Sequence, residues 1–165
     1  NNIIGNNTIK DNSQYGIYLN YSLLNNITGN IFINNTIAAI NLTNAQNNTI
    51  INNSGDGNTY GISFASGSSG NQIYNNIIRN SRKDAVFIAD SASGNNSFAN
   101  MSLLGTNNSF YDVRFASSGI NNTFIIDTTY RSFFFFNTYV STFCVWRHGG
   151  KYFIFFFSMF NEPFL

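Results

Sequence analysis

The densest group of charged side chains lies in one short segment. Arg79, Arg82, Lys83 and Asp84 fall within six residues, and Asp90 follows soon after. Cations beside a carboxylate form strong hydrogen bonds to acidic and hydroxyl-rich ligands, so this segment is a candidate sugar or uronate site. The alternative interpretation is a solvated turn, since charged residues are mostly exposed.

A second candidate surface comes from a four-residue apolar motif that recurs at residues 16–19, 39–42, 61–64, 85–88 and 112–115. Tyr15, Tyr60 and Tyr111 each precede a copy of this motif. Its third position should point outward if the second and fourth point inward, and it holds Tyr18, Asn41, Ser63, Phe87 and Arg114. Exposed Tyr and Asn on a shallow face suit stacking on sugar rings together with amide hydrogen bonds, while a packing stack along the repeat is the alternative. The candidate carbohydrate-binding residues are therefore Tyr18, Arg82, Lys83, Asp84, Asp90 and Arg114.

Catalytic chemistry has weaker support. Glycoside hydrolysis needs two carboxylates at a set separation. Of the acidic residues before position 131, only Asp84 and Asp112 have similar positions in adjacent repeats. Asp84 directly precedes one copy of the apolar motif and Asp112 is the first residue of the next copy, so their positions differ by one residue. A Ser–His–Asp set is not available in the repeats, because the single histidine is His148. No catalytic residue is predicted, and the residues favour a non-catalytic module over an enzyme, with both alternatives left open.

Soft metal ligands are scarce. Copper sites use Cys, Met or His, and the chain offers Met101, Cys144, His148 and Met159. Cys144 and His148 are four residues apart, a spacing that suits one face of a helix. A single Cys forms no disulfide framework. We predict no metal site and no cofactor.

Composition favours strands and excludes some partners. Charged residues make up 9% and the net charge is +1, so the chain has no electrostatic basis for binding nucleic acid. Hydrophobic residues make up 43%, which argues against disorder. The 20 Ile outnumber the 7 Leu, and β-branched side chains favour sheets.

Asparagine, 31 of the 165 residues, marks a repeat. Asn markers lie at positions 2, 25, 47, 71, 95 and 121, at intervals of 23, 22, 24, 24 and 26. The apolar motif begins 14 residues after the marker in the first four units, at Gly16, Ala39, Gly61 and Ala85. Within each unit, apolar and polar residues alternate over three short stretches that are separated by polar turns, which is typical of three short strands. Asn tolerates left-handed turns and can form amide ladders, so the repeat predicts a parallel β-solenoid.

The repeat stops near residue 131, where composition changes. Eleven of the 18 Phe lie in residues 131–165. We therefore divide the chain into a β-helix array over residues 1–130 and a Phe-rich tail over residues 131–165. Three interpretations of the tail stay open: a cap of degenerate strands, a segment in a non-native reading frame, and a membrane-associated hairpin.

The repeat resembles a known family. The run Asn71-Gln72-Ile73-Tyr74-Asn75-Asn76-Ile77-Ile78, followed by Ala85-Val86-Phe87-Ile88, is similar to the repeats of the NosD-like family. That family belongs to the right-handed β-helix domains with a pectin-lyase-like fold. The resemblance covers about residues 1–127 and implies an all-β, right-handed single-stranded parallel β-helix, here of about five to six coils. It also implies a periplasmic, copper-associated role in the maturation of nitrous oxide reductase.

These observations favour a fragment of an extracellular or cell-envelope protein, with no signal peptide in the sequence. The expected function is a non-catalytic structural or carbohydrate-binding module. The alternatives are a divergent polysaccharide lyase or hydrolase fragment and a NosD-like periplasmic copper-maturation accessory protein. The expected partner is a polysaccharide or cell-envelope glycan, with membrane contact only if the Phe-rich tail is native.

Asn-x-Ser/Thr sequons are frequent in the repeats. The repeat pattern Asn-Asn-Thr-Ile itself generates many of them, so most of their Asn residues are expected to serve structural ladders. Their first residues are Asn6, Asn20, Asn26, Asn34, Asn41, Asn47, Asn52, Asn95, Asn100, Asn107 and Asn121.

Overall fold

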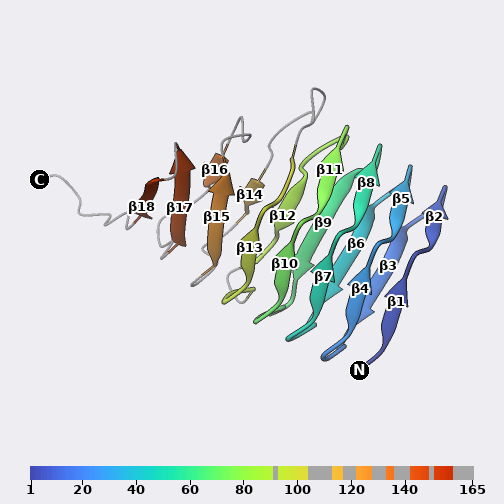
Figure 1. The fold of residues 1–165 in the computed structure, drawn as a ribbon. Helices are drawn as coiled ribbons and strands as arrows, with labels where there is room; N and C mark the ends of the chain where they lie inside the picture. Colours follow the sequence, from blue (N-terminus) through green and yellow to red (C-terminus); the bar gives the residue numbers. More distant parts are fainter. Residues whose placement is uncertain are drawn as a thin grey trace, which may run out of the picture.

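The chain folds as a rod of stacked coils in which every described element is a strand (Figure 1). This computed structural model describes residues 1–90, 93–103, 113–116, 122–127, 133–135, 142–148 and 151–157, with backbone only from residue 124 onward. No helix in these ranges is long and apolar enough to cross a membrane. The three faces of the rod are three sheets, here named A, B and C.

Each complete coil contributes one strand to each sheet. Sheet A contains β1 (Ile3–Gly5), β4 (Asn26–Thr28), β7 (Thr49–Ile51), β10 (Gln72–Tyr74), β13 (Ser97–Ala99), β15 (Thr123–Asp127), β17 (Thr142–His148) and β18 (Lys151–Phe157). Sheet B contains β2 (Thr8–Lys10), β5 (Ile31–Ile33), β8 (Ser54–Asp56) and β11 (Ile77–Arg79). Sheet C contains β3 (Tyr15–Asn20), β6 (Ala38–Thr43), β9 (Tyr60–Ala65), β12 (Val86–Ile88), β14 (Val113–Phe115) and β16 (Phe133–Phe135).

Stacked apolar side chains fill the inside of the rod. In sheet A, Ile27 pairs with Ile50, which pairs with Ile73, and all three are fully buried. Strands from β1 to β17 pair in parallel with the strand one coil away, so equivalent residues lie above one another. This arrangement confirms the predicted right-handed parallel β-helix. Four coils of the described residues carry all three strands, and further coils add strands to sheets A and C.

The Asn ladder is confirmed, but the predicted marker positions were partly wrong. The ladder in the turn before sheet A runs through Asn2, Asn25, Asn48, Asn71, Asn96 and Asn122, with separations of 23, 23, 23, 25 and 26. Asn47 and Asn95 lie one residue before it and have left-handed backbones. In these Asn-Asn pairs, therefore, the first residue makes the turn and the second makes the ladder.

Strands continue beyond the last described side chains. The backbone of β17 pairs in parallel with β15, and β18 pairs antiparallel with β17. Cys144 and His148 therefore lie on a strand, which corrects the helical spacing suggested for them. Four residues span about 13 Å along a strand, against about 6 Å along a helix. The division of the chain at residue 130 stays a prediction.

Candidate functional site

The outer face of sheet C carries a group of aromatic side chains because its strands bend at their start. A Cβ added to Gly16 would lie 2.6 Å from the Phe32 ring inside the rod, so this position faces inward. Ile17, the next residue, is also buried. Two consecutive inward positions leave Tyr15 and Tyr18 outside, and Gly61 produces the same bend after Tyr60.

Two aromatic pairs stack on this face. The ring centroids of Tyr15 and Tyr18 are 5.0 Å apart at an interplanar angle of 21°. Those of Tyr60 and Phe87, from adjacent coils, are 4.9 Å apart at 15°. Both distances are typical of favourable ring stacking. The Tyr18 side chain stays 49% exposed, so it is available to a ligand.

Phe87 packs between side chains from the two adjacent coils. The Tyr60 ring lies against it from the preceding coil, and the Arg114 guanidinium carbon lies 4.1 Å from its ring centroid from the next coil. Phe87 is therefore in contact with side chains from both adjacent coils. Tyr60 is half-buried and has the Lys83 ammonium 5.6 Å from its ring centroid.

A buried ion pair fixes the edge of this aromatic group. Arg114 Nε donates to Asp84 Oδ2 at 2.7 Å, with side-chain exposures of 24% and 0%. Register explains the contact, because Arg114 lies opposite Phe87 and Asp84 is three positions before Phe87 in the chain. The pair neutralises Asp84 and leaves the exposed Arg82 and Lys83 as the outward charges of the segment.

Between the two aromatic pairs lies a floor of small side chains. Ala38, Asn41 and Ser63 are all buried there. Asn41 Nδ2 donates to Ser63 Oγ at 3.0 Å, and Asn41 Oδ1 accepts from Thr43 Oγ1 at 2.9 Å. Both ends of the Asn41 amide are therefore used within sheet C.

The structure separates some of the predicted site residues. Asp90 anchors a turn, where it accepts hydrogen bonds from the backbone N–H groups of Ser66, Gly67 and Ser93. Tyr18 lies in the first coil, whereas Lys83 and Asp84 lie in the fourth. Arg82 is exposed. Only Lys83, Asp84 and Arg114 meet around the second aromatic pair.

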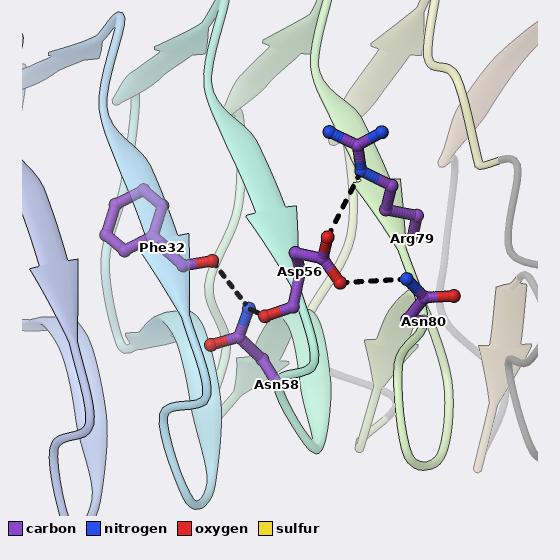
Figure 2. A network of polar contacts seen from close by, with 5 residues as sticks. All are labelled: Phe32, Asp56, Asn58, Arg79 and Asn80. Carbon is purple, nitrogen blue, oxygen red and sulfur yellow. Dashed lines mark hydrogen bonds and ion pairs between the residues drawn. The ribbon is translucent and has the colours of Figure 1, made fainter.

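Arg79 belongs to a different face, as Figure 2 shows. Its Nε lies 3.4 Å from Asp56 Oδ2 at the end of sheet B. Asn80 Nδ2 donates to the other oxygen of this carboxylate at 2.9 Å. Asn58 Nδ2 donates to the backbone oxygens of Phe32 and Asp56, which ties the same corner to the ladder. The charged segment is therefore divided between two faces of the rod.

Tyr60 and Phe87 are the site residues that the predicted set lacked. Each was noted in its own motif, Tyr60 before it and Phe87 at its third position. Their stacking depends on the offset between adjacent coils, which becomes visible only when Val86 is aligned with Ile62. That alignment places Asp84 opposite Tyr60 and Phe87 opposite Ser63.

No two of the aspartates with described side chains oppose each other in adjacent coils of one sheet. Asp56 ends a strand of sheet B, whereas Asp84 and Asp90 flank the same strand of sheet C. Asp112 lies outside the described residues, and Asp127 is described only by its backbone. The described part of the chain therefore shows no carboxylate pair of the kind that glycosidases use.

The residues with described side chains do not fit a copper site. None of them form a group of three or more His, Cys, Asp or Glu that could hold a metal ion. Met101, a soft side chain, is 3% exposed and its Sδ accepts from Asn76 Nδ2 at 3.6 Å. It continues an Asn ladder and does not face an open coordination site. The side chains of Cys144, His148 and Met159 lie outside the described set.

Fold and face together define a right-handed parallel β-helix module with an aromatic and charged outer face. The family model described as "NosD: Periplasmic copper-binding protein (NosD)" matches residues 1–132. The chain therefore belongs to the NosD family. Searches of curated proteins and of solved structures found no match.

Proposed function

We propose that this chain is a non-catalytic β-helix module of the cell envelope that binds a glycan across the outer face of sheet C. The observation that carries the proposal is the pair of aromatic stacks, Tyr15–Tyr18 and Tyr60–Phe87, on one face of the rod. The family description supports a periplasmic location.

The spacing of the aromatic stacks suits an extended ligand. Tyr18 and Tyr60 come from coils two apart, which is about 10 Å along the rod. The residues that lie between the two stacks in the sheet, Ala38, Asn41 and Ser63, have small side chains, so no bulky group separates the stacks. A sugar chain laid on this floor would contact the Tyr18 ring at one end and the Tyr60 ring at the other.

Charge favours an acidic glycan. Asp84 is paired with Arg114, whereas Lys83 is exposed and has its ammonium over the Tyr60 ring, and Arg82, the preceding residue, is exposed as well. The outward charges near the second stack are therefore positive. A chain that carries carboxylates would gain charge-assisted hydrogen bonds there, and a neutral chain would not.

The test is retention of the full chain on a panel of immobilised acidic and neutral polysaccharides, with release of new chain ends recorded in parallel. We expect retention on acidic chains without cleavage. Tyr60→Ala should weaken binding about tenfold, which corresponds to about 1.4 kcal/mol. Tyr74→Ala is the matched control, since Tyr74 is also half-buried but lies on sheet A.

Other outcomes would contradict the proposal. Equal losses in the Tyr60→Ala and Tyr74→Ala variants would place binding elsewhere. New chain ends that disappear in an Asp84→Asn variant would identify the module as a polysaccharide-cleaving enzyme. Retention on no polysaccharide would leave a structural spacer as the function.

A further inference from the structure

The fold divides its turn asparagines into two chemically different groups. Ladder residues such as Asn48 are buried, and their Nδ2 donates to neighbouring oxygens. The residues that precede them have left-handed backbones and point outward, as Asn6, Asn34 and Asn47 do at φ values of 57°, 52° and 54°. Among the described residues, none accepts a hydrogen bond from the Nδ2 of these three.

These three asparagines also share an orientation. Each lies beside a glycine one coil further along: Gly29 for Asn6, Gly57 for Asn34 and Gly70 for Asn47. A Cβ built on Gly29 or Gly57 would lie 2.5 Å from the Oδ1 of its asparagine. The amide oxygen therefore faces the glycine backbone, and the amide nitrogen donates no hydrogen bond to any described residue.

All three begin an Asn-Asn-Thr sequence, which is the acceptor pattern for attachment of a glycan to Asn. The earlier expectation placed most sequon asparagines in ladders. In these three sequons the ladder residue is the middle one, and the acceptor is the exposed first one. Since the acceptor amide makes no structural hydrogen bond, a glycan attached to it would leave the ladder intact.

We infer that Asn6, Asn34 and Asn47 are N-glycosylation sites on the turns of the β-helix. In the reaction, Nδ2 forms a bond to the anomeric carbon of a polyprenyl-phosphate-linked oligosaccharide, supplied with its transferring enzyme. The bond between that carbon and the phosphate oxygen breaks, and the amide proton leaves to the phosphate. This reaction requires the chain to be outside the cytoplasm, and it does not depend on glycan binding at sheet C.

The sequon at Asn41 provides an internal control. Its first residue is buried and its Nδ2 donates to Ser63, so the same reaction there would break the floor of sheet C. Exposure and a free amide distinguish the three turn residues from Asn41, so we predict modification of the three Asn-Asn-Thr sites and none at Asn41.

The experiment isolates the protein from the cells that make it and sequences its peptides by mass spectrometry, with fragmentation that preserves the sugar–Asn bond. We expect glycan mass on at least two of the three turn sites and an unmodified Asn41. In a Thr36→Ala variant, which changes an exposed side chain, the Asn34 glycan should disappear while the Asn47 glycan stays. Glycan on fewer than two of these sites, glycan on Asn41, or a retained Asn34 glycan in Thr36→Ala would overturn the inference.

Discussion

Asn47 and Asn48 are neighbours in the chain with opposite environments. Asn47 is exposed with φ at 54°, whereas Asn48 is fully buried and accepts from both the backbone N and the side-chain Nδ2 of Asn25. One dipeptide thus supplies both the turn and the ladder step. The Asn-rich composition follows from this division of roles, which recurs from coil to coil.

The two residues should respond very differently to the same substitution. Asn48→Gly leaves two buried donors of Asn25 without an acceptor, and each such group costs about 1–3 kcal/mol. Asn47→Gly keeps a residue that tolerates left-handed backbone, so its effect should stay within about 0.5 kcal/mol. Urea unfolding of both variants tests this difference. Equal unfolding midpoints would show that the ladder contributes no stability.

A second pair of variants tests packing inside the rod. A small cavity is lined by Phe32, Gly55, Gly61 and Ile78, among others. A Cβ on Gly55 would make ordinary contacts of 3.5–3.9 Å, so Gly55→Ala should raise the free energy of unfolding by about 0.5–1 kcal/mol. A Cβ on Gly61 would collide with the Ala85 backbone oxygen and with Ile78, so Gly61→Ala should lower it by about 1–3 kcal/mol. Thermal melting of both variants measures the sign, and stabilisation by Gly61→Ala would refute the inward bend.

The effects of substituting Asp84 and Arg114 on stability should be strongly coupled, because the two side chains form a buried ion pair. In a double-mutant cycle with Asp84→Asn and Arg114→Gln, we expect a coupling energy of about 1–3 kcal/mol. The exposed pair Asp56–Arg79, with 43% and 53% side-chain exposure, is the control and should couple by less than about 1 kcal/mol. If both cycles gave the same small value, the Asp84–Arg114 contact would not organise the edge of the aromatic group.

Copper binding by the chain should not depend on side chains inside the β-helix. Met101 is buried and its sulfur already accepts a hydrogen bond from Asn76, so Met101→Leu should leave Cu(I) binding by the full chain unchanged. Competition with a chromophoric Cu(I) chelator measures this, with a Cys144→Ser, His148→Ala variant as the comparison. Weaker Cu(I) binding after Met101→Leu would show that the ladder position is a ligand.

Much of the fold followed from the period of the sequence. Side chains that repeat every 22–26 residues can stack only if each coil places them over the last, and this constraint predicts a parallel solenoid. The exact ladder position did not follow, because Asn47 and Asn48 are the same residue type and differ only in backbone conformation and burial, which the sequence does not display.

The candidate site was predicted less completely. Asp84 and Arg114 were both in the predicted set, but their pairing arises from the offset between coils, which their separation of 30 residues does not reveal. Asp90 carries the same chemistry as Asp84, yet the turn at Ser66 and Gly67 uses its carboxylate. Residue type alone does not distinguish these two environments.

The central claim is that a glycan lies across the outer face of sheet C. Its most direct test is NMR of the full chain with ¹³C-labelled tyrosine rings, titrated with oligosaccharides of the retained polysaccharide. We predict that the ring signals of Tyr18 and Tyr60 shift together along one binding curve, while that of Tyr74 on sheet A stays in place. A shift at Tyr74, or saturation with no shift at Tyr18 and Tyr60, would contradict the claim.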